Sequence, residues 1–396
     1  MKTDVIKTRF LFQGISILLL TFFIPLQLTI QKPLKDNSLT LLKHLQSGRS
    51  DNFAWGISWI QYINPNLLHS VICPFILNFY HPLRAPKTIL FFCLSLYLAN
   101  LFCILFQEGR PFWYSKDIKP KLCLHGFGNP SCEVILSSIV LGSISIEFLH
   151  KHKHRNFIYL VPISFILFIS FSFIYLSEYF PHQIVNSLFI SFILITLNFS
   201  FEKDLLKLSN RFSQKYYKNR VYIVYWFLAC LSMILLFCSI DLLILIFSPE
   251  SPKTINRAVK HCSQSYEPNA DHNIRSSSNV FYIFGYVAGS LMLSKKISVF
   301  YTMTSYWKKC IRFFITAGTC FGIYLLFGKF YLDLIPAQDF LTREFFHSVV
   351  PNLICSLIMT LGFPFIFKWM KLILVIPVDL TKGERKKLFS FKKSVI

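Results

Sequence analysis

The sequence predicts an all-α protein, a multi-pass integral membrane helical bundle with about ten transmembrane helices. More than half of the 396 residues are apolar, and the mean hydropathy is +0.50. Apolar blocks of about 18 to 20 residues, the length that crosses a bilayer as a helix, recur along the chain. Charged residues lie mostly between these blocks. A soluble domain would not arrange its apolar residues in this way.

The net charge of +22 has two possible explanations. One is binding to nucleic acid, but the basic residues flank apolar blocks, so membrane topology and anionic lipid headgroups explain them better. We therefore expect membrane lipids as partners and no nucleic acid. The 11 cysteines form no CxxC pair and no cluster with histidine. No metal site and no cofactor are expected.

The chain begins with a short basic stretch, Met1–Arg9, followed by the apolar stretch Phe10–Ile30. No small-x-small cleavage site follows this stretch, and its length suits a span. We therefore assign residues 1–30 as an uncleaved transmembrane anchor rather than a signal peptide. The polar segment 31–51 comes next, with a short amphipathic helix predicted around Leu39–Leu45.

The spans that follow are bounded by prolines and by charged loops. Asn52–Phe79 reads as a span broken near Pro65, and Thr88–Phe106 is a continuous one that begins after Pro86. The further predicted spans are Val134–Leu149, Phe157–Leu176, Phe180–Phe199, Val221–Phe247, Val280–Leu293, Phe313–Leu332 and Ser348–Phe367. The apolar run Leu372–Val378 is too short to span and is predicted to lie at the interface. Gly285 and Gly289 form a GxxxG pattern, which predicts tight helix packing.

Lys and Arg are more frequent on one set of alternating loops than on the other. By the positive-inside rule this places both termini in the cytosol. The polar loop Gln107–Asn129 then lies on the non-cytosolic face. Cys123 and Cys262 fall in loops on that same face, where a disulfide between them is allowed.

Three polar signals lie at span ends on the non-cytosolic face. They are Gly109–Trp113, Gly128–Glu133 and Tyr179–Gln183. A phosphate ester needs fixed cations and N–H groups around its oxygens, a nucleophile in line and a proton donor for the leaving group. We therefore compared the three segments with the parts of a phosphate site.

The ordered set resembles the three-part site of the type 2 phosphatidic acid phosphatase/haloperoxidase superfamily. Within it, the glucose-6-phosphatase and sphingosine-phosphate phosphatase branches are the most similar. Arg110-Pro111 matches the first part, Pro130-Ser131 the second, and the run from Ile174 to Val185 is similar to glucose-6-phosphatase. The resemblance implies a phosphatase-like membrane core over residues 40–200, followed by additional transmembrane helices and a basic cytosolic tail over 201–396.

The resemblance also implies that the site is degenerate. Its phosphate-binding remnants are Arg110, Ser131 and Ser172. Cys103 and Phe173 stand where the family has a Lys and an Arg, while Glu133 replaces the general-acid His and Tyr179 the nucleophilic His. No catalytic residue is intact. Each lost charge-assisted contact removes roughly 1.5–3 kcal/mol, and a neutral phenol does not replace the nucleophile without activation.

Several roles stay open. His182, one helical turn past Tyr179, is either a structural contact or a substitute nucleophile. Glu133 either pairs with Arg110 or donates a proton from a carboxyl whose pKa is raised by burial. Asp241 lies inside a predicted span, where a carboxylate either has a function or bonds a neighbouring helix.

Three functions follow from these alternatives. The first is a catalytically impaired phosphatase-superfamily protein, a pseudoenzyme that acts in binding or regulation and retains a pocket for a phosphorylated lipid or sugar. The second is an active lumenal phosphomonoesterase. The third is a transporter or lipid-handling protein that uses Asp241 or Lys329. Endoplasmic reticulum or another internal membrane is the expected location.

Overall fold

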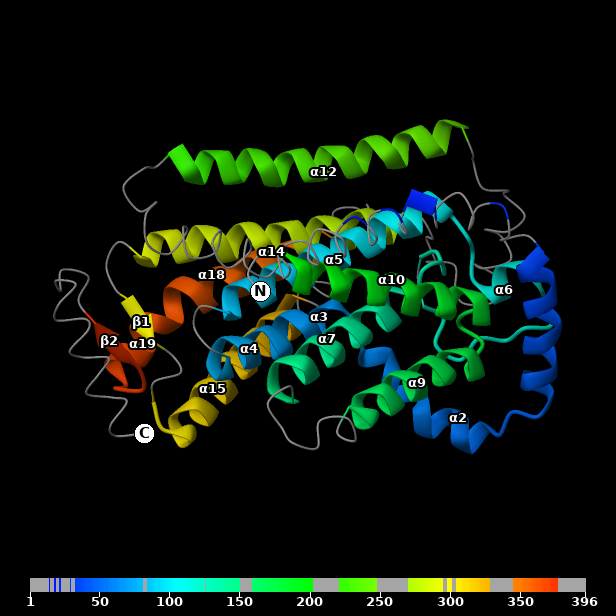
Figure 1. Cartoon of the computed structure of the whole chain (residues 1–396), viewed down its shortest axis with the longest axis horizontal. Coiled ribbons are helices and arrows are strands. Elements are labelled where there is room, and N and C mark those ends of the chain that lie inside the picture. The colour runs from blue at the N-terminus through cyan, green and yellow to red at the C-terminus, as the bar shows by residue number, and fades with distance from the viewer. Residues whose placement is uncertain are drawn as a thin grey trace, which may run out of the picture.

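The computed structural model describes most of the helical part of the chain. The described residues are Gly14, Leu18, Thr21, Phe22, Thr29, 33–80, 84–124, 126–149, 159–201, 221–247, 270–294, 298–300, 304–327 and 345–376. Most of the predicted anchor over residues 1–30, the predicted disulfide partner Cys262, and Lys329 lie outside them. Figure 1 shows an all-α bundle whose long helices run in roughly one direction.

The first described part is a series of short helical segments. A helix over residues 33–47 covers the predicted amphipathic segment. The elements that follow are α2 (Asp51–Ile57), η1 (Ser58–Tyr62), α3 (Pro65–Leu67), η2 (Leu68–Ile72) and α4 (Cys73–Phe79). The predicted break near Pro65 is confirmed, because the helical path is interrupted at Ile63 and Asn64 and Pro65 begins the next segment. Proline is favoured at the first position of a helix because it has no N–H, and an N–H at that position would have no partner in a preceding turn.

The next helices correspond to the predicted spans within a few residues. They are α5 (Ala85–Phe106), α7 (Cys132–Leu149), α9 (Leu160–Tyr175) and α10 (Pro181–Ser200), while the short α6 (Pro111–Tyr114) lies in the predicted loop Gln107–Asn129. The start of α10 is fixed locally: Pro181 is its first residue, and Gln183 Oε1 accepts a 3.0 Å hydrogen bond from the N–H of Phe180. This side chain replaces one bond that the first turn of a helix lacks.

The C-terminal half packs against α5. Its elements are α12 (Val221–Phe247), α14 (Ala270–Ser294), α15 (Tyr306–Leu325), η4 (Phe345–Val349), α18 (Val350–Leu357), η5 (Ile358–Gly362) and α19 (Phe363–Trp369). The helix α14 lies between α5 and α18, and α12 lies along its outer side (Figure 1). Buried apolar side chains from both halves form one continuous core.

The predicted GxxxG packing is confirmed in α14. A Cβ at Gly285 would lie 2.1 Å from Ser356 Oγ, and one at Gly289 would lie 2.0 Å from Thr360 Oγ1. A side chain at either position would force Ser356 or Thr360 to move, so the two glycines allow α14 to approach α18 and η5 closely.

The structure adds one element that the sequence did not predict. The strand β2 (Leu374–Ile376) pairs antiparallel with β1 (Ser298–Phe300) at the end of the bundle opposite α6 (Figure 1). Its residues lie within the apolar run Leu372–Val378, which was predicted only as an interfacial segment. A strand of three residues is stabilised by its pairing with the neighbouring strand. The three residues alone therefore show no sequence pattern that predicts a strand.

Three helical segments among the described residues are long and apolar enough to cross a membrane: Ala85–Tyr114, which contains α5 and α6, Pro181–Ser200 and Val350–Trp369. Shorter apolar helices accompany them at Leu68–Phe79, Cys132–Ile146, Leu160–Tyr175 and Val224–Ile240. These lengths and compositions indicate a membrane protein.

Candidate functional site

The three polar signals of the sequence meet at one end of the bundle, the end that carries α6 in Figure 1. The chain passes this end where α5 stops, through the loop to α7, and again between α9 and α10. Gly128 permits a close contact there, since a Cβ would lie 2.6 Å from Gln183 Oε1. Segments separated by up to 80 residues thus share one polar cluster.

Arg110 lies at the centre of the cluster and is almost fully buried. It precedes α6, and its Nε donates to the carbonyl of Gly126 at 2.9 Å. Its guanidinium carbon lies 4.3 Å from the ring centre of Tyr179, a cation–π contact. Tyr179 thus touches Arg110 through its ring face.

The hydroxyl of Tyr179 donates a short hydrogen bond to Glu133 Oε2. Ser131 Oγ donates to the same oxygen at 3.4 Å, and the Ser131 N–H donates to Ser187 Oγ at 2.7 Å. Burial raises the pKa of Tyr179 well above its ordinary value; the positive charge of Arg110 opposes this shift and the negative charge of Glu133 adds to it. The phenol therefore stays protonated at neutral pH and is not activated as a nucleophile.

The other positions singled out in the sequence lie around this pair. The Phe173 ring meets the Tyr179 ring edge-on at 5.5 Å. Ser172 Oγ donates to the carbonyl of Phe168 at 2.8 Å within its own helix. Cys103 Sγ donates to the carbonyl of Pro130 at 3.0 Å. The structure thus brings the aligned positions together, although the Ser172 hydroxyl bonds its own helix.

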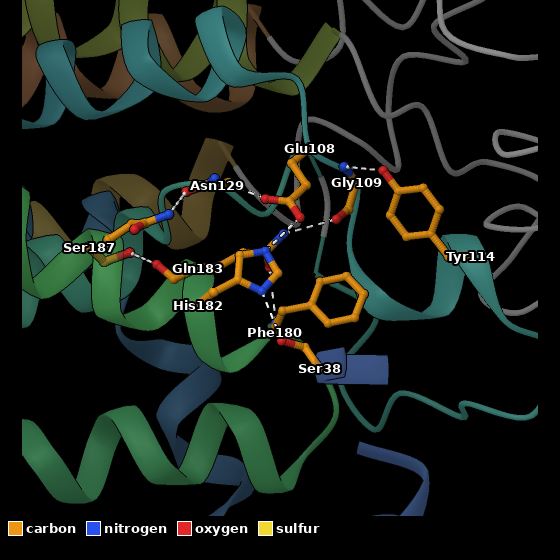
Figure 2. Close-up of polar contacts among 10 residues, drawn as sticks. Ser38, Glu108, Gly109, Tyr114, Asn129, Phe180, His182, Gln183 and Ser187 are labelled. Carbon is orange, nitrogen blue, oxygen red and sulfur yellow. Dashed lines mark hydrogen bonds and ion pairs between the residues drawn. The ribbon is translucent and has the colours of Figure 1, made fainter. Parts of the chain in front are cut away.

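A second polar network lies beside the first and is drawn in Figure 2. His182 Nε2 lies 2.7 Å from Glu108 Oε1, and His182 Nδ1 lies 3.0 Å from Ser38 Oγ. Asn129 Nδ2 donates to the other oxygen of Glu108 at 2.9 Å, and Phe180 stacks on the imidazole. His182 therefore connects the start of α10 to the loop after α5 and to the helix over 33–47.

Glu178 is fully buried and organises the loop before α7. Its carboxylate accepts three backbone hydrogen bonds, from Leu122 at 2.7 Å, Cys123 at 3.1 Å and Leu124 at 3.2 Å. Burial raises the pKa of Glu178, while Arg110 and the three N–H groups oppose the shift. Cys123 itself is disulfide-bonded, and the partner expected from the sequence, Cys262, lies outside the described residues.

Three carboxyl groups are buried at this end of the bundle. Glu108, Glu133 and Glu178 are all buried here, at 1%, 4% and 0% exposure. In the described part of this end they face the buried guanidinium of Arg110 and the imidazole of His182.

Sequence reasoning missed Ser38, Glu108, Asn129 and Glu178. The sequence offered only their closeness to residues already singled out: Glu108 comes two residues before Arg110, and Glu178 comes directly before Tyr179. Asp241 lies within α12, and its side chain is outside the described part of the structure. The described residues contain no group of three or more His, Cys, Asp or Glu placed to hold a metal ion.

Comparison with known proteins supports the grouping of these segments. Residues 87–207 match the family model described as the PAP2 superfamily. This part of the chain is therefore a PAP2 superfamily domain, and it contains Arg110, Ser131, Glu133 and Tyr179. Comparisons with curated proteins and with solved structures find no match for the chain.

Proposed function

We propose that this membrane protein carries a degenerate PAP2 site and acts in binding or regulation rather than in phosphate-ester hydrolysis. The observation that carries the proposal is the hydrogen bond from Tyr179 to Glu133. In the resemblance drawn from the sequence, these two residues stand where the family has its nucleophilic and general-acid histidines. A neutral phenol bound to a carboxylate supplies neither function.

The charge at the site supports the same conclusion. A phosphate group entering beside Arg110 would approach Glu133, whose Oε2 is held by Tyr179 and Ser131. Two like unit charges 4 Å apart repel by about 4 kcal/mol at an effective dielectric constant of 20. The cationic partners that would offset this repulsion in the family are replaced here by Cys103 and Phe173.

The finer architecture is part of the proposal. We place about ten spans in the chain, with both termini in the cytosol, a core over residues 40–200 that resembles the glucose-6-phosphatase branch, and further helices over 201–396. The disulfide at Cys123 supports an oxidising, non-cytosolic compartment at the site end of the bundle. This arrangement fits the endoplasmic reticulum or another internal membrane, with a phosphorylated lipid or sugar as the ligand class.

The test is phosphate release by the purified protein in detergent, measured over sugar, sphingoid-base and phosphatidic acid phosphates. We expect no turnover above that of an Arg110→Ala variant. Turnover by the native chain that disappears in Arg110→Ala would overturn the proposal. A rebuilt variant combining Cys103→Lys, Glu133→His, Phe173→Arg and Tyr179→His should gain activity, and the same variant without Tyr179→His is its matched control.

One observation favours an active lumenal phosphomonoesterase as the second candidate. His182 is held by Glu108 at one ring nitrogen and lies next to the Ser38 hydroxyl at the other, which is how a carboxylate orients a reactive imidazole. A His182→Gln variant in the same assay separates the two candidates. If native turnover exists and is lost in His182→Gln while Thr40→Ala keeps it, the imidazole performs the chemistry.

A further inference from the structure

Two cysteines meet at the centre of the degenerate site. Cys103, in the last turn of α5, and Cys132, the first residue of α7, have their sulfur atoms 3.5 Å apart. Both are free thiols, with Cys103 fully buried and Cys132 7% exposed. Cys103 Sγ also donates to the carbonyl of Pro130, and Cys132 Sγ to Asn100 Oδ1 at 3.4 Å. A disulfide needs an S–S distance of about 2.0 Å, so a local shift of about 1.5 Å would join them.

These two residues coincide with departures from the family pattern. The resemblance to the family places a phosphate-binding Lys at Cys103 and a Gly at Cys132, directly after Pro130-Ser131. Each replacement alone removes a feature of the phosphate site. Together they place two thiols in contact, so the loss of one chemistry coincides with the gain of another.

The surroundings favour thiol–disulfide chemistry. Cys123, in the loop that connects α5 to α7, is already disulfide-bonded, which indicates that this end of the bundle meets an oxidising compartment. Cys132 is the first residue of the 18-residue helix α7, next to the loop that carries Pro130 and Ser131. Cys132 is also the more exposed of the two residues, so an external disulfide reaches it first.

We propose that Cys103 and Cys132 form a reversible dithiol–disulfide site, with a disulfide such as oxidised glutathione as the oxidant. The Cys132 thiolate attacks one sulfur of the oxidant and releases one thiolate, leaving a mixed disulfide at Cys132. The Cys103 sulfur gives up its proton to the released thiolate, attacks Cys132 Sγ and displaces the second thiolate, which takes up from solvent the proton that Cys132 had lost. In total, two protein thiols and one disulfide yield one protein disulfide and two small thiols.

The bond would tie the end of α5 to the start of α7 across Pro130, whose carbonyl now accepts the Cys103 hydrogen bond. Oxidation removes that donor and fixes the distance between two segments that carry Arg110 and Glu133 on either side of the site. The pair thus reports the redox state of the compartment directly at the degenerate site.

The test uses the full-length protein in detergent, equilibrated with glutathione buffers of graded composition and, separately, with the small disulfide bis(2-hydroxyethyl) disulfide. After acid quenching, free thiols are alkylated under denaturing conditions, and unreduced digests are searched by mass spectrometry for the linked Cys103–Cys132 peptides. We expect the ratio of linked to free peptide to rise by about tenfold for each tenfold rise in the ratio of oxidised glutathione to squared thiol concentration. Phosphate release is not measured, so the outcome does not depend on the proposed loss of catalysis.

Two single variants test the order of attack. A Cys103→Ser chain should retain the added small thiol at Cys132, whereas a Cys132→Ser chain should show none at Cys103. The thiol of Cys230, buried in α12, is the control and should be alkylated in every buffer. Full alkylation of Cys103 and Cys132 in every buffer, or a link that no thiol reduces in the folded protein, would overturn the proposal.

Discussion

His182 Nε2 and Glu108 Oε1 lie 2.7 Å apart, both buried, and join the first turn of α10 to the residues after α5. Through its other nitrogen the same imidazole contacts Ser38, on the helix over 33–47. One side chain therefore fixes three segments around the site. The predictions below start from this contact.

Replacing His182 should destabilise the protein more than replacing Ser38, which contacts it from the helix over 33–47. His182→Ala leaves a buried Glu108 oxygen without its imidazole, so we expect a loss of about 1–3 kcal/mol, whereas Ser38→Ala should cost about 1 kcal/mol. Thermal unfolding in detergent, followed by tryptophan fluorescence, measures both. Thr40→Ala, on the exposed side of the same helix, is the control and should leave the melting temperature unchanged.

The hydroxyl of Tyr179 should matter for stability. Tyr179→Phe keeps the ring contacts with Arg110 and Phe173 but removes the donor to buried Glu133. We expect a destabilisation of about 1–3 kcal/mol, seen as a lower midpoint of chemical or thermal unfolding. Tyr175→Phe is the matched control, because its hydroxyl accepts one hydrogen bond, from Ser50 N at 2.8 Å, at an exposed position. Equal effects of the two variants would contradict a buried Tyr179–Glu133 pair.

The two glycines of α14 should tolerate no side chain. Gly285→Ala and Gly289→Ala each place a methyl group about 2 Å from a hydroxyl oxygen of the neighbouring helix, and such overpacking costs about 1–3 kcal/mol. Gly318 and Gly322 in α15 have the same four-residue spacing but open space around them. Their Ala variants should be neutral or stabilising by up to about 1 kcal/mol. The contrast in melting temperature between the two pairs is the measurement.

Ionisation of the buried Glu178 carboxyl should make the protein less stable as the pH rises. Because burial raises the pKa of this carboxyl in the folded state, the folded protein binds more protons than the unfolded chain between the two pKa values. Its contribution is fully present below the unfolded value of about 4.3 and is lost as the pH rises through the folded pKa. The melting temperature of Glu178→Gln, relative to the native chain, should therefore improve steadily between acidic and neutral pH. A flat difference would contradict this sign.

The contribution of Asp117 to stability should change with pH in the opposite direction. Its exposed carboxylate lies 2.6 Å from Lys43 Nζ, and this contact lowers its pKa. The pair is therefore present above the unfolded pKa of about 3.9 and is lost as the pH falls through the folded value. Since both groups are exposed, we expect a small, salt-sensitive effect of Asp117→Asn, confined to faster hydrogen exchange in the helix over 33–47.

The long helices could be predicted from the sequence because their signal is local. The prediction for α12, Val221–Phe247, matches the structure at both ends. The strands β1 and β2 could not be predicted, since three-residue strands depend on a partner about 75 residues away in the chain.

At the site, the resemblance of the three polar signals to a known family was enough to group Arg110, Ser131 and Tyr179. It was not enough to find Glu108, Glu178 and Ser38. Their roles depend on contacts between distant segments, such as the three hydrogen bonds that Glu178 accepts from backbone N–H groups of the loop before α7. A single charged residue in a polar loop gives no sign of burial until that loop is folded over it.

The hydrogen bond between Ser38 and His182 crosses the boundary of the matched domain, which begins at residue 87. The packing of α5 along α14 crosses its other boundary. A polypeptide limited to residues 87–207 would expose the imidazole on one side and an apolar helix face on the other, and we expect it to aggregate. A chimera with a related phosphatase must therefore transfer the helix over 33–47 and α14 together with the domain, because the domain is not an interchangeable module.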